Sequence, residues 1–299
     1  MAMYGGIEAG GTKFVCIAGT GPTDIVAETR FPTTSPQETI GKVLEFFHQV
    51  NILAGAPLVA VGIACFGPLD LNPSSPTYGQ ITSTPKPGWP GTDIVAEIHN
   101  ALNVPVLLDT DVNGAAMGEG VWGAGQGLDN FMYLTIGTGI GGGLLIHGKP
   151  VHGLVHPEMG HIRIPHDWQE DPYSGTCPYH GDCFEGLANG PAIQARWGQP
   201  GETLPESHPA WDLEAKYIAL ALHSYVCVFS PLKIILGGGV MQQAHLFPRI
   251  RVHLAESLNG YIRSTKIQSN IDEYVVPPGL GNYSGVLGGL ALARSALGD

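Results

Sequence analysis

The sequence contains little charge, and most of that charge is acidic. Charged residues make up only 13% of the chain, with 14 basic against 26 acidic residues, so the formal net charge is -12 with histidine neutral. A surplus of negative charge repels nucleic-acid phosphates and anionic lipid surfaces. We therefore expect no nucleic acid among the partners of this protein.

Long apolar runs and closely spaced cysteines are also scarce. The longest apolar stretch, residues 217–229, is interrupted by His223 and Ser224 and falls short of the roughly 20 residues that span a bilayer. The N-terminus lacks the basic and apolar regions of a secretory signal. Of five cysteines, only Cys177 and Cys183 are close together, which fits a reducing compartment better than a disulfide framework. These features predict a cytoplasmic protein without a membrane segment.

Glycine, in contrast, is abundant. The chain has 43 glycines in 299 residues, about twice the usual share, without a Gly-X-Y period. Hydrophobic residues make up 43%, which excludes disorder, and the length allows one large or two ordinary domains. Glycine in this amount is typical of tight turns and of sites lined by backbone.

Many of these glycines belong to a unit that occurs twice. A strand, a glycine-rich turn and a second strand are predicted at residues 3–8, 9–12 and 13–18, and again at residues 131–136, 137–143 and 144–147. The repetition predicts a weak internal duplication and therefore two similar α/β halves.

Further elements alternate between helices and strands. Ser35 is the expected N-cap of a helix that begins at Pro36, with Glu38 closing a capping box. Residues 58–65 predict a strand covered on both faces, and the proline-rich residues 66–90 predict a long irregular loop of the kind that is usually functional. The other predicted strands lie at 24–31, 104–108, 233–236 and near Tyr274. Helices are predicted at 93–102, 211–229, 245–258 and 283–297, and a further helical stretch follows residues 109–113 and ends at residue 119.

Two of the glycine turns could hold a phosphate group. The string Gly10-Gly11-Thr12-Lys13 is either a tight hairpin or an anion-binding concavity in which the Thr12 hydroxyl is an additional donor. In the second turn, Thr138 and Gly139 lie among further glycines, so the backbone could approach phosphates closely. Neither turn is a Walker P-loop, and a Rossmann site is disfavoured because a strand is predicted to follow the second turn.

A third glycine turn follows the strand at residues 233–236. Gly237, Gly238 and Gly239 could let a flat base or a ribose approach the backbone, or could simply be the entry to the next helix. Taken alone, the turn leaves both interpretations open.

Acidic residues after the strand at 104–108 are candidates for the chemistry. Asp111 could orient an attacking alcohol and accept its proton during phosphoryl transfer, and Asp109 could do this instead. Either aspartate, or Asn113, could alternatively cap the following helix. Glu8, next to the first glycine turn, could orient Mg²⁺ or its waters, or be a solvated carboxylate at the strand end.

The sharpest local signal is a cluster of cysteine and histidine. Cys177, His180 and Cys183 recur at a spacing of three, and His161 lies upstream as a fourth ligand. A Cys₂His₂ set is a reasonable structural Zn²⁺ site, since four protein ligands leave no open position. With the metal bound, Glu158 would lie beside a ligand and could hold polyol hydroxyls. The alternative is a pair of buried free thiols with exposed histidines.

Taken together, these strings resemble the ROK family of sugar kinases, and more closely its zinc-containing bacterial fructokinases. The resemblance covers nearly the whole chain. It implies phosphate-binding roles for both glycine turns and a catalytic role for Asp111. It implies sugar-binding roles for the set Asn113, Glu158, His161 and Glu185, and zinc ligation by the set His161, Cys177, His180 and Cys183.

The sequence departs from the commonest family pattern at three places. Glu8 stands where aspartate is usual, which leaves metal handling plausible but moves the carboxylate one methylene outward. Thr110 precedes the base where asparagine is common, and Val112 follows it where alanine is common. His180 occurs in a segment where many members have only cysteines, a variation that favours the fructokinase branch.

The resemblance also implies a fold. We expect a two-domain actin-like or hexokinase-like (ribonuclease H-like) α/β fold with a zinc-stapled loop. The small domain would comprise residues 1–112 and about 284–299, and the large domain residues 113–283. The active site would lie in the cleft between them. A homodimer is expected because the family commonly forms one.

We therefore expect an ATP-dependent hexose kinase that uses Mg²⁺ and makes fructose 6-phosphate. Alternatives within the family are a glucokinase, a mannokinase or an N-acetylhexosamine kinase. A sugar-responsive regulator is disfavoured, because the first phosphate motif begins within about ten residues of Met1 and we expect no DNA-binding extension. A catalytically silent sugar-binding module would need a lost base, whereas Asp111 is present.

Overall fold

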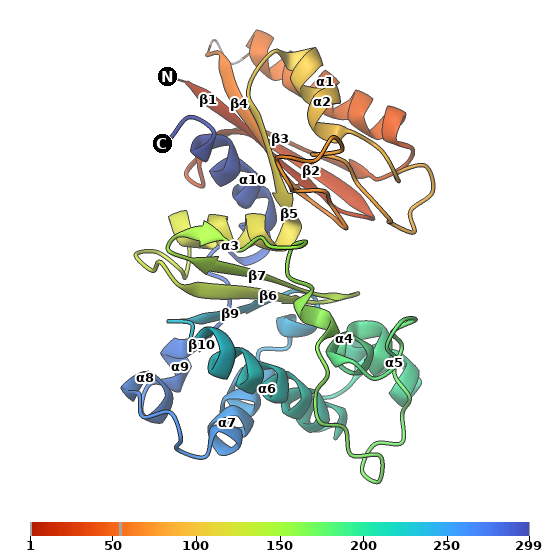
Figure 1. The fold of residues 1–299 in the computed structure, drawn as a ribbon, viewed down its shortest axis with the longest axis vertical. Coiled ribbons are helices and arrows are strands. Elements are labelled where there is room, and N and C mark those ends of the chain that lie inside the picture. The colour runs from red at the N-terminus through yellow and green to blue at the C-terminus, as the bar shows by residue number, and fades with distance from the viewer. Residues whose placement is uncertain (1, 54–55, 299) are drawn as a thin grey trace. The chain divides into compact units, whose positions relative to one another are not determined.

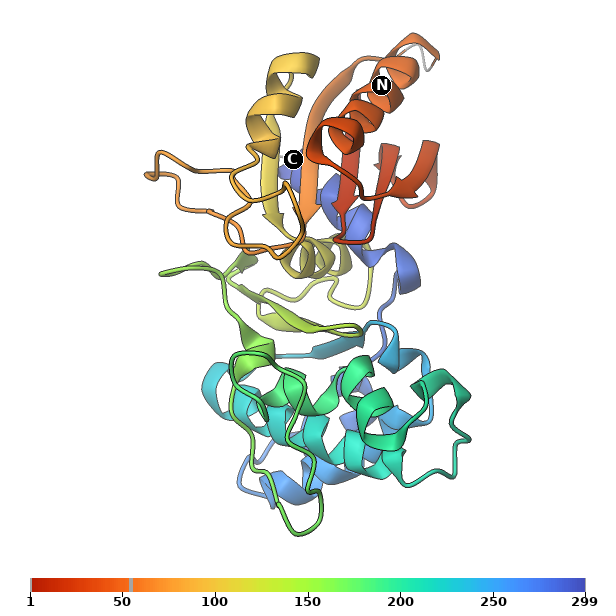
Figure 2. The ribbon, with the colours of Figure 1, turned by 90° about the vertical axis from the view of Figure 1, so that its right-hand side faces the viewer.

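Two α/β units make up the chain. The computed structural model describes residues 2–53 and 56–298. The first unit comprises residues 1–129, 143–157 and 279–299, and the second comprises residues 130–142 and 158–278. Figures 1 and 2 show both units as ribbons.

The sheet of the first unit has the strand order β3-β2-β1-β4-β5. Strand β1 (Met3–Ala9) pairs antiparallel with β2 (Lys13–Gly21), which pairs antiparallel with β3 (Asp24–Pro32). On its other side β1 pairs parallel with β4 (Leu58–Cys65), and β4 pairs parallel with β5 (Val106–Thr110). The carboxyl ends of β1, β4 and β5 therefore lie at one edge of this sheet, where ligand-handling residues gather in open α/β sheets.

Helices cover both faces of this sheet (Figure 1). Side chains alternate between the faces along each strand, so Phe14 packs in the core with α1 (Pro36–Leu53) and α2 (Ile94–Leu102), whereas Val15 packs on the opposite face with α10 (Ser284–Ser295). Burial on both faces explains why β4 has the near-continuous apolar sequence from which it was predicted.

The second sheet has the order β10-β9-β6-β7-β8. Its strands are β6 (Phe131–Ile136), β7 (Ile140–Ile146), β8 (Lys149–Pro150), β9 (Ile234–Gly237) and β10 (Val275–Val276). Written from the other edge, this order is β8-β7-β6-β9-β10. It matches the order β3-β2-β1-β4-β5 of the first sheet, strand for strand. The two sheets thus share one topology, which confirms the predicted internal duplication.

Of the remaining helices, α6 and α7 lie within one residue of the predicted bounds, whereas α4, α5, α8 and α9 were not predicted. Helices found in the structure are α3 (Asp111–Trp122), α4 (Phe184–Ala188), α5 (Gly190–Trp197), α6 (Ala210–Phe229), α7 (Leu246–Leu258), α8 (Thr265–Gln268) and α9 (Ile271–Tyr274). Short 3₁₀ turns lie at Met159–His161, Gly201–Thr203, Val240–Gln242 and Gly281–Tyr283. Residues 66–90 contain no named helix or strand, as predicted, and leave β4 as an irregular loop (Figure 2).

Three local predictions need correction. The strand predicted at 104–108 is β5 at Val106–Thr110, because its last residues pair in register with Ala64 and Cys65 of β4. The strand predicted at 144–147 begins at Ile140, so the second turn is shorter than expected. Ser35 accepts the Glu38 amide at 3.3 Å, but the Glu38 carboxylate accepts from Thr34 and Lys42 rather than closing a capping box.

A buried carboxylate ties α3 to α10 within the first unit. Glu119 is fully buried and accepts the amides of Ala124, Gly279 and Leu280 at 2.7–3.0 Å and the Ser284 hydroxyl at 2.7 Å. Four donors offset the cost of burying this charge, so the start of α10 is fixed against the end of α3.

The helices that the structure describes include none with the length and hydrophobicity of a membrane span.

Candidate active site

The junction of β5 and α3 carries the two candidate bases. Asp109 is 3% exposed, and its Oδ1 accepts the Thr110 amide at 2.7 Å and the Asn113 side-chain amide at 2.8 Å. The Thr110 hydroxyl accepts the Asn113 backbone amide at 3.1 Å and thereby caps α3. The cap expected from Asp109, Asp111 or Asn113 is therefore provided by Thr110.

Asp111 is the first residue of α3 and is half-buried. Its Oδ1 accepts the backbone amide of Val112 at 2.9 Å. Asp111 also acts on Cys65 at the end of β4. Burial is the larger cause of the raised pKa of the Cys65 thiol, and the negative charge of Asp111 is the smaller one. Asp111 thus places a carboxylate at the carboxyl edge of the first sheet, and helix capping does not require it there.

Asn113 presents an unused acceptor. The side chain is 1% exposed, and its amide nitrogen donates to Asp109. Its Oδ1 is buried and has no hydrogen-bond partner among the described residues. A buried oxygen without a partner is costly, and the hydroxyl of a bound ligand would satisfy it.

His152 completes this cluster, although no sequence pattern groups it with other residues and an ordinary surface or core residue was expected there. Its Nε2 lies 3.0 Å from Asp109 Oδ2 and 3.2 Å from Oδ1. The hydrogen bond to Asp109 raises the pKa of the imidazole. His152 lies 43 residues along the chain from Asp109, and no spacing rule connects the two. This pair can therefore be recognised only in the three-dimensional structure.

The first glycine turn lies between β1 and β2, as predicted. The Gly10 amide donates to the Lys13 carbonyl at 3.0 Å, and the Thr33 hydroxyl donates to the Gly10 carbonyl at 2.7 Å. A Cβ atom at Gly11 would meet nothing within 4 Å, so this side of the turn is open to a ligand.

Glu8 precedes this turn near the end of β1. Burial raises the pKa of its carboxyl group, and the charges of Lys13 and Arg30 oppose that effect. Its carboxylate accepts no hydrogen bond from any residue that the structure describes. A carboxylate with unused lone pairs suits Mg²⁺, which binds one or two carboxylates and keeps several waters.

The second glycine turn is anchored by the helices that follow it in the second unit. The Gly190 amide donates to the Gly137 carbonyl at 2.7 Å, and the Asn189 side chain donates to the Thr138 carbonyl at 3.1 Å. Glu185 accepts the amide of Ile140 at 2.8 Å. These contacts hold the turn at the start of α5.

A pocket of about 570 Å³ adjoins this turn within the second unit. Its volume falls in the range of about 300–1,000 Å³ typical of ligand sites. Gly137, Thr138 and Gly239 provide backbone at its wall, Ile193, Trp211 and Val240 provide apolar surface, and Gln194, Gln242 and Gln243 provide polar groups. Of the residues that the sequence predicted to bind a nucleotide, Thr138 and Gly239 line this pocket. The sequence did not predict the side chains of α5 and of the residues after β9, which show no motif.

Gly237 is the last residue of β9, Gly238 and Gly239 follow it, and Gly239 lines the pocket. Gly238 has a φ of +94°, and a Cβ atom there would overlap the backbone of Ile136. A Cβ atom at Gly237 would press on the Tyr133 ring. Packing against β6 is therefore sufficient to explain two of these glycines.

The predicted zinc ligands come together. The ligand atoms of His161, Cys177, His180 and Cys183 all lie within 4.8 Å of one another. The three S···N distances, from Cys177 to both histidines and from Cys183 to His161, are 3.6–3.7 Å. Tetrahedral zinc with ordinary bond lengths requires an S···N distance of about 3.6 Å. The four side chains therefore fit a zinc ion.

Glu185 connects this cluster to the second glycine turn. One carboxylate oxygen accepts the Ile140 amide, and the other lies 4.0 Å from His161 Nε2. A carboxylate facing the second ring nitrogen of a metal-ligating histidine is a common supporting contact. Burial raises the pKa of the Cys183 thiol to about 11, so a metal ion would have to displace protons to bind.

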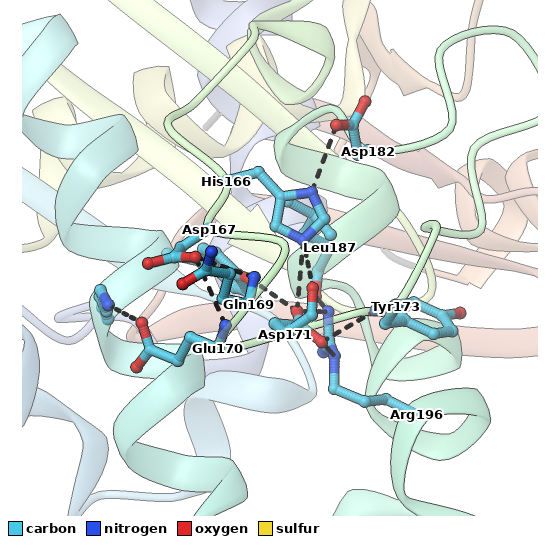
Figure 3. A network of polar contacts seen from close by, with 11 residues as sticks. His166, Asp167, Gln169, Glu170, Asp171, Tyr173, Asp182, Leu187 and Arg196 are labelled. Atoms are coloured by element: carbon cyan, nitrogen blue, oxygen red, sulfur yellow. Dashed lines mark hydrogen bonds and ion pairs between the residues drawn. The ribbon is translucent and has the colours of Figure 1, made fainter.

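A polar network holds the segment between His161 and Cys177 (Figure 3). Asp171 is buried and accepts from Arg196 and from the Tyr217 hydroxyl at 2.6 Å. His166 lies between the Asp171 carbonyl at 2.9 Å and Asp182 Oδ2 at 3.3 Å. Asp182 directly precedes Cys183, one of the predicted zinc ligands. The network therefore helps to hold the ligand cluster in position.

The fold is that of the ROK hexokinases. A solved structure of a ROK hexokinase from Thermus thermophilus matches with a TM-score of 0.80 and 25% identity, covering 99% of each chain. The chain belongs to the ROK family, whose family model matches residues 4–296.

Two curated relatives extend this likeness. A Bacillus subtilis (strain 168) protein, whose name gives fructokinase as a provisional assignment, is 48% identical over 99% of this chain and 96% of its own length. A fructokinase from Zymomonas mobilis is 45% identical over 98% of this chain and 97% of its own length. The chain therefore spans nearly the full length of both relatives.

Proposed function

We propose that this protein is an ATP-dependent hexose kinase that phosphorylates the 6-hydroxyl of fructose in preference to other hexoses. Identity above 40% to a fructokinase over nearly the whole chain supports the substrate. The observation that carries the chemistry is the β5–α3 junction, where Asp111 is not needed as a helix cap and lies two residues from a buried, unused amide oxygen.

In this proposal Asp111 is the general base. It orients the sugar hydroxyl and accepts its proton as the hydroxyl oxygen bonds to the γ-phosphorus of ATP, while the bond to ADP breaks. Asn113 Oδ1 accepts a hydrogen bond from another sugar hydroxyl. Glu158, His161 and Glu185 are assigned to the sugar by family resemblance. Most of the rate enhancement comes from positioning and charge neutralisation.

The nucleotide is assigned to the glycine turns and to the pocket beside the second turn. The amides at Gly10–Lys13 and at Thr138 and Gly139 would hold phosphates, and the pocket lined by Ile193, Trp211 and Gly239 would hold the base and ribose. Mg²⁺ near Glu8 would neutralise the charge that develops on the phosphate oxygens.

Zinc has a structural role in this proposal. His161, Cys177, His180 and Cys183 would fill all four positions of a tetrahedral ion, which leaves none open for a reacting group. The metal would fix His161 and hence Glu185, which supports the second glycine turn. Family resemblance is also our basis for proposing a cytoplasmic homodimer.

Replacing Asp111 by asparagine tests the assignment of the base. Asparagine keeps the size of the side chain but cannot take the proton, so we expect kcat to fall by about 10²- to 10⁴-fold with sugar affinity nearly unchanged. A coupled ADP-release assay measures kcat, and calorimetry measures hexose binding.

The matched control is Asp93→Asn, the same substitution at the start of α2. Asp93 caps that helix by accepting the Ala96 amide at 2.9 Å, and asparagine caps equally well. This variant should keep full activity. An Asp111→Asn enzyme with near-normal turnover would disprove the role of Asp111.

A further inference from the structure

We propose that His152, fixed by the buried Asp109, is a hexose-binding residue that donates a hydrogen bond from Nδ1 to a sugar hydroxyl and so contributes to the choice of hexose. The inference rests on the proposed kinase function and adds a residue to the hexose site. It assigns Asp109 a positioning role in place of the alternative role of base.

The surroundings of Asp109 support that positioning role. Three donors from the protein converge on its carboxylate: the Thr110 amide, the Asn113 side chain and His152 Nε2. A buried carboxylate is stable only when it is hydrogen-bonded or paired in this way. Oδ1 accepts from Thr110 and Asn113, and Oδ2 faces His152, so Asp109 holds two side chains in place, which favours a positioning role over that of base.

Asp109 also determines which nitrogen of the His152 ring carries a proton. A carboxylate only accepts hydrogen bonds, so the Nε2 atom that faces it carries a proton. Protonation of the remaining nitrogen then creates an Nδ1–H donor. The structure gives that nitrogen no hydrogen-bond partner among the described residues, and 39% of the side chain is exposed. In the protonated ring this donor is therefore available to a ligand.

His152 and Asn113 together match the chemistry of a sugar. Their side chains are adjacent, with 3.4 Å between Asn113 Nδ2 and His152 Nε2, because both nitrogens point at Asp109. One residue then offers an unused buried acceptor, Asn113 Oδ1, and the other offers an unused donor. An adjacent donor and acceptor can bind two neighbouring hydroxyl groups, which hexoses provide along the whole carbon chain.

Asp109 is the charged group that bears on His152, and Tyr78 bears on Asp109 in turn. Asp109 on β5 favours the protonated ring, whereas partial burial opposes it. Tyr78 of the 66–90 loop faces Asp109, and burial first and that charge second raise the pKa of the phenol. Deprotonation of His152 would remove the Nδ1–H donor, so kcat/KM for the hexose should fall as pH rises through the pKa of His152.

The test compares His152→Ala, His152→Gln and a control, His48→Ala, which removes an exposed histidine from α1. Each is assayed with ATP on fructose, glucose, mannose and monodeoxy analogues of the preferred hexose. We expect His152→Ala to lose at least about 10-fold in kcat/KM on that hexose, mainly through KM, with the preference over other hexoses reduced. His48→Ala should match wild type.

The deoxy analogues identify the partner hydroxyl. Wild type should discriminate against the analogue that lacks this hydroxyl, whereas His152→Ala should use that analogue and the parent sugar equally. His152→Gln keeps a side-chain donor that does not titrate, so it should restore part of the KM loss and lack the fall of kcat/KM at high pH. A purely structural role would instead lower activity on all sugars equally and lower the melting temperature.

Two outcomes separate this inference from the proposed function. A wild-type enzyme without activity on any hexose would overturn the proposed function itself. An active wild type would overturn only the role of His152 if His152→Ala kept its KM and hexose preference, or if His152→Gln lost activity at the same high pH as wild type. If His152→Ala does not fold, His152→Gln with the deoxy analogues decides the question.

Discussion

Asp109 and Asp111 differ in their surroundings despite being two residues apart. Asp109 ends a buried strand and is held by three protein donors, whereas Asp111 begins a helix and is half-buried. The sequence left both as candidate bases, because the decisive partner, His152, comes from a distant segment. By contrast, the residue types at positions 111 and 113 were enough to predict this junction as a candidate site.

Other residues could not have been found from the sequence at all. Glu119 accepts four hydrogen bonds that fix α10, and three of the donors lie about 160 positions further along the chain. Gln194 and Trp211 line the pocket beside the second glycine turn but belong to no motif. Such roles depend on contacts that only the tertiary structure creates.

Glu214 yields a prediction about stability at the residue scale. It lies 1% exposed in α6, and neither carboxylate oxygen has a partner among the described residues. Burial raises its pKa well above 4.5, and the charge of Arg196 only partly opposes this. The folded state therefore holds a proton that the unfolded state releases, so this group's contribution to stability is lost as pH rises from 4.5 through the folded pKa.

Replacing Glu214 by glutamine removes this loss, because the amide does not ionise. We expect the melting temperature of Glu214→Gln, relative to wild type, to rise between pH 5 and pH 8. Glu45→Gln, an exposed substitution on α1, should show a constant difference across the same range. A Glu214→Gln variant whose difference from wild type does not change with pH would contradict this account of the buried carboxyl.

At the scale of elements, pattern predicted most of the strands and helices. Strands β4 and β6 have the predicted bounds, since an apolar run between turn residues marks a buried strand clearly. The errors arose at β5 and β7. Asp109 is a poor strand former that pairing with β4 holds in the sheet, and Gly142 and Gly143 belong to a strand whose close neighbours leave no room for side chains.

The segment with the proposed zinc ligands, residues 161–183, shows which features spacing can predict and which it cannot. Cys177, His180 and Cys183 were identified by spacing, and the upstream His161 lies with them in the structure. The carboxylate of Glu185 near His161, and the Asp171 network that holds the intervening segment, were not predictable from spacing. Metal ligands close in sequence form a recognisable motif, whereas supporting contacts do not.

Removing a zinc ligand tests this element. Wild-type protein should contain about one Zn²⁺ per chain by elemental analysis, and Cys177→Ser should lose most of it, because serine is a poor zinc ligand. We expect the melting temperature to fall by several degrees, because each kcal/mol of lost stability lowers it by about 2–4 °C in a domain of this size. Wild type treated with a chelator should behave in the same way.

Cys227→Ser is the matched control, because Cys227 is an exposed cysteine on α6 outside the cluster. It should keep both the metal and the melting temperature. Carefully prepared wild-type protein without zinc, and with a melting temperature unaffected by added zinc, would favour the interpretation of Cys177 and Cys183 as free thiols.

At the scale of the whole molecule, the shared strand order of the two sheets is the strongest agreement between sequence and structure. Each sheet begins with strands around a glycine turn, and those turns carry the proposed phosphate contacts. The duplication was visible in the sequence because both turns are rich in glycine and lie between predicted strands. Substrate choice was less accessible, because it depends on a few side chains such as His152 on irregular segments.

The measurement that tests the central claim most directly is the kcat/KM of wild-type enzyme for ATP-dependent phosphorylation of fructose, compared with glucose, mannose and N-acetylglucosamine. We predict a value for fructose at least about tenfold above the others, or about 1.4 kcal/mol of transition-state discrimination, with fructose 6-phosphate as product. Preference for another hexose would contradict the fructokinase assignment. Absence of ADP release with every sugar, in the presence of Mg²⁺ and zinc, would contradict the kinase itself.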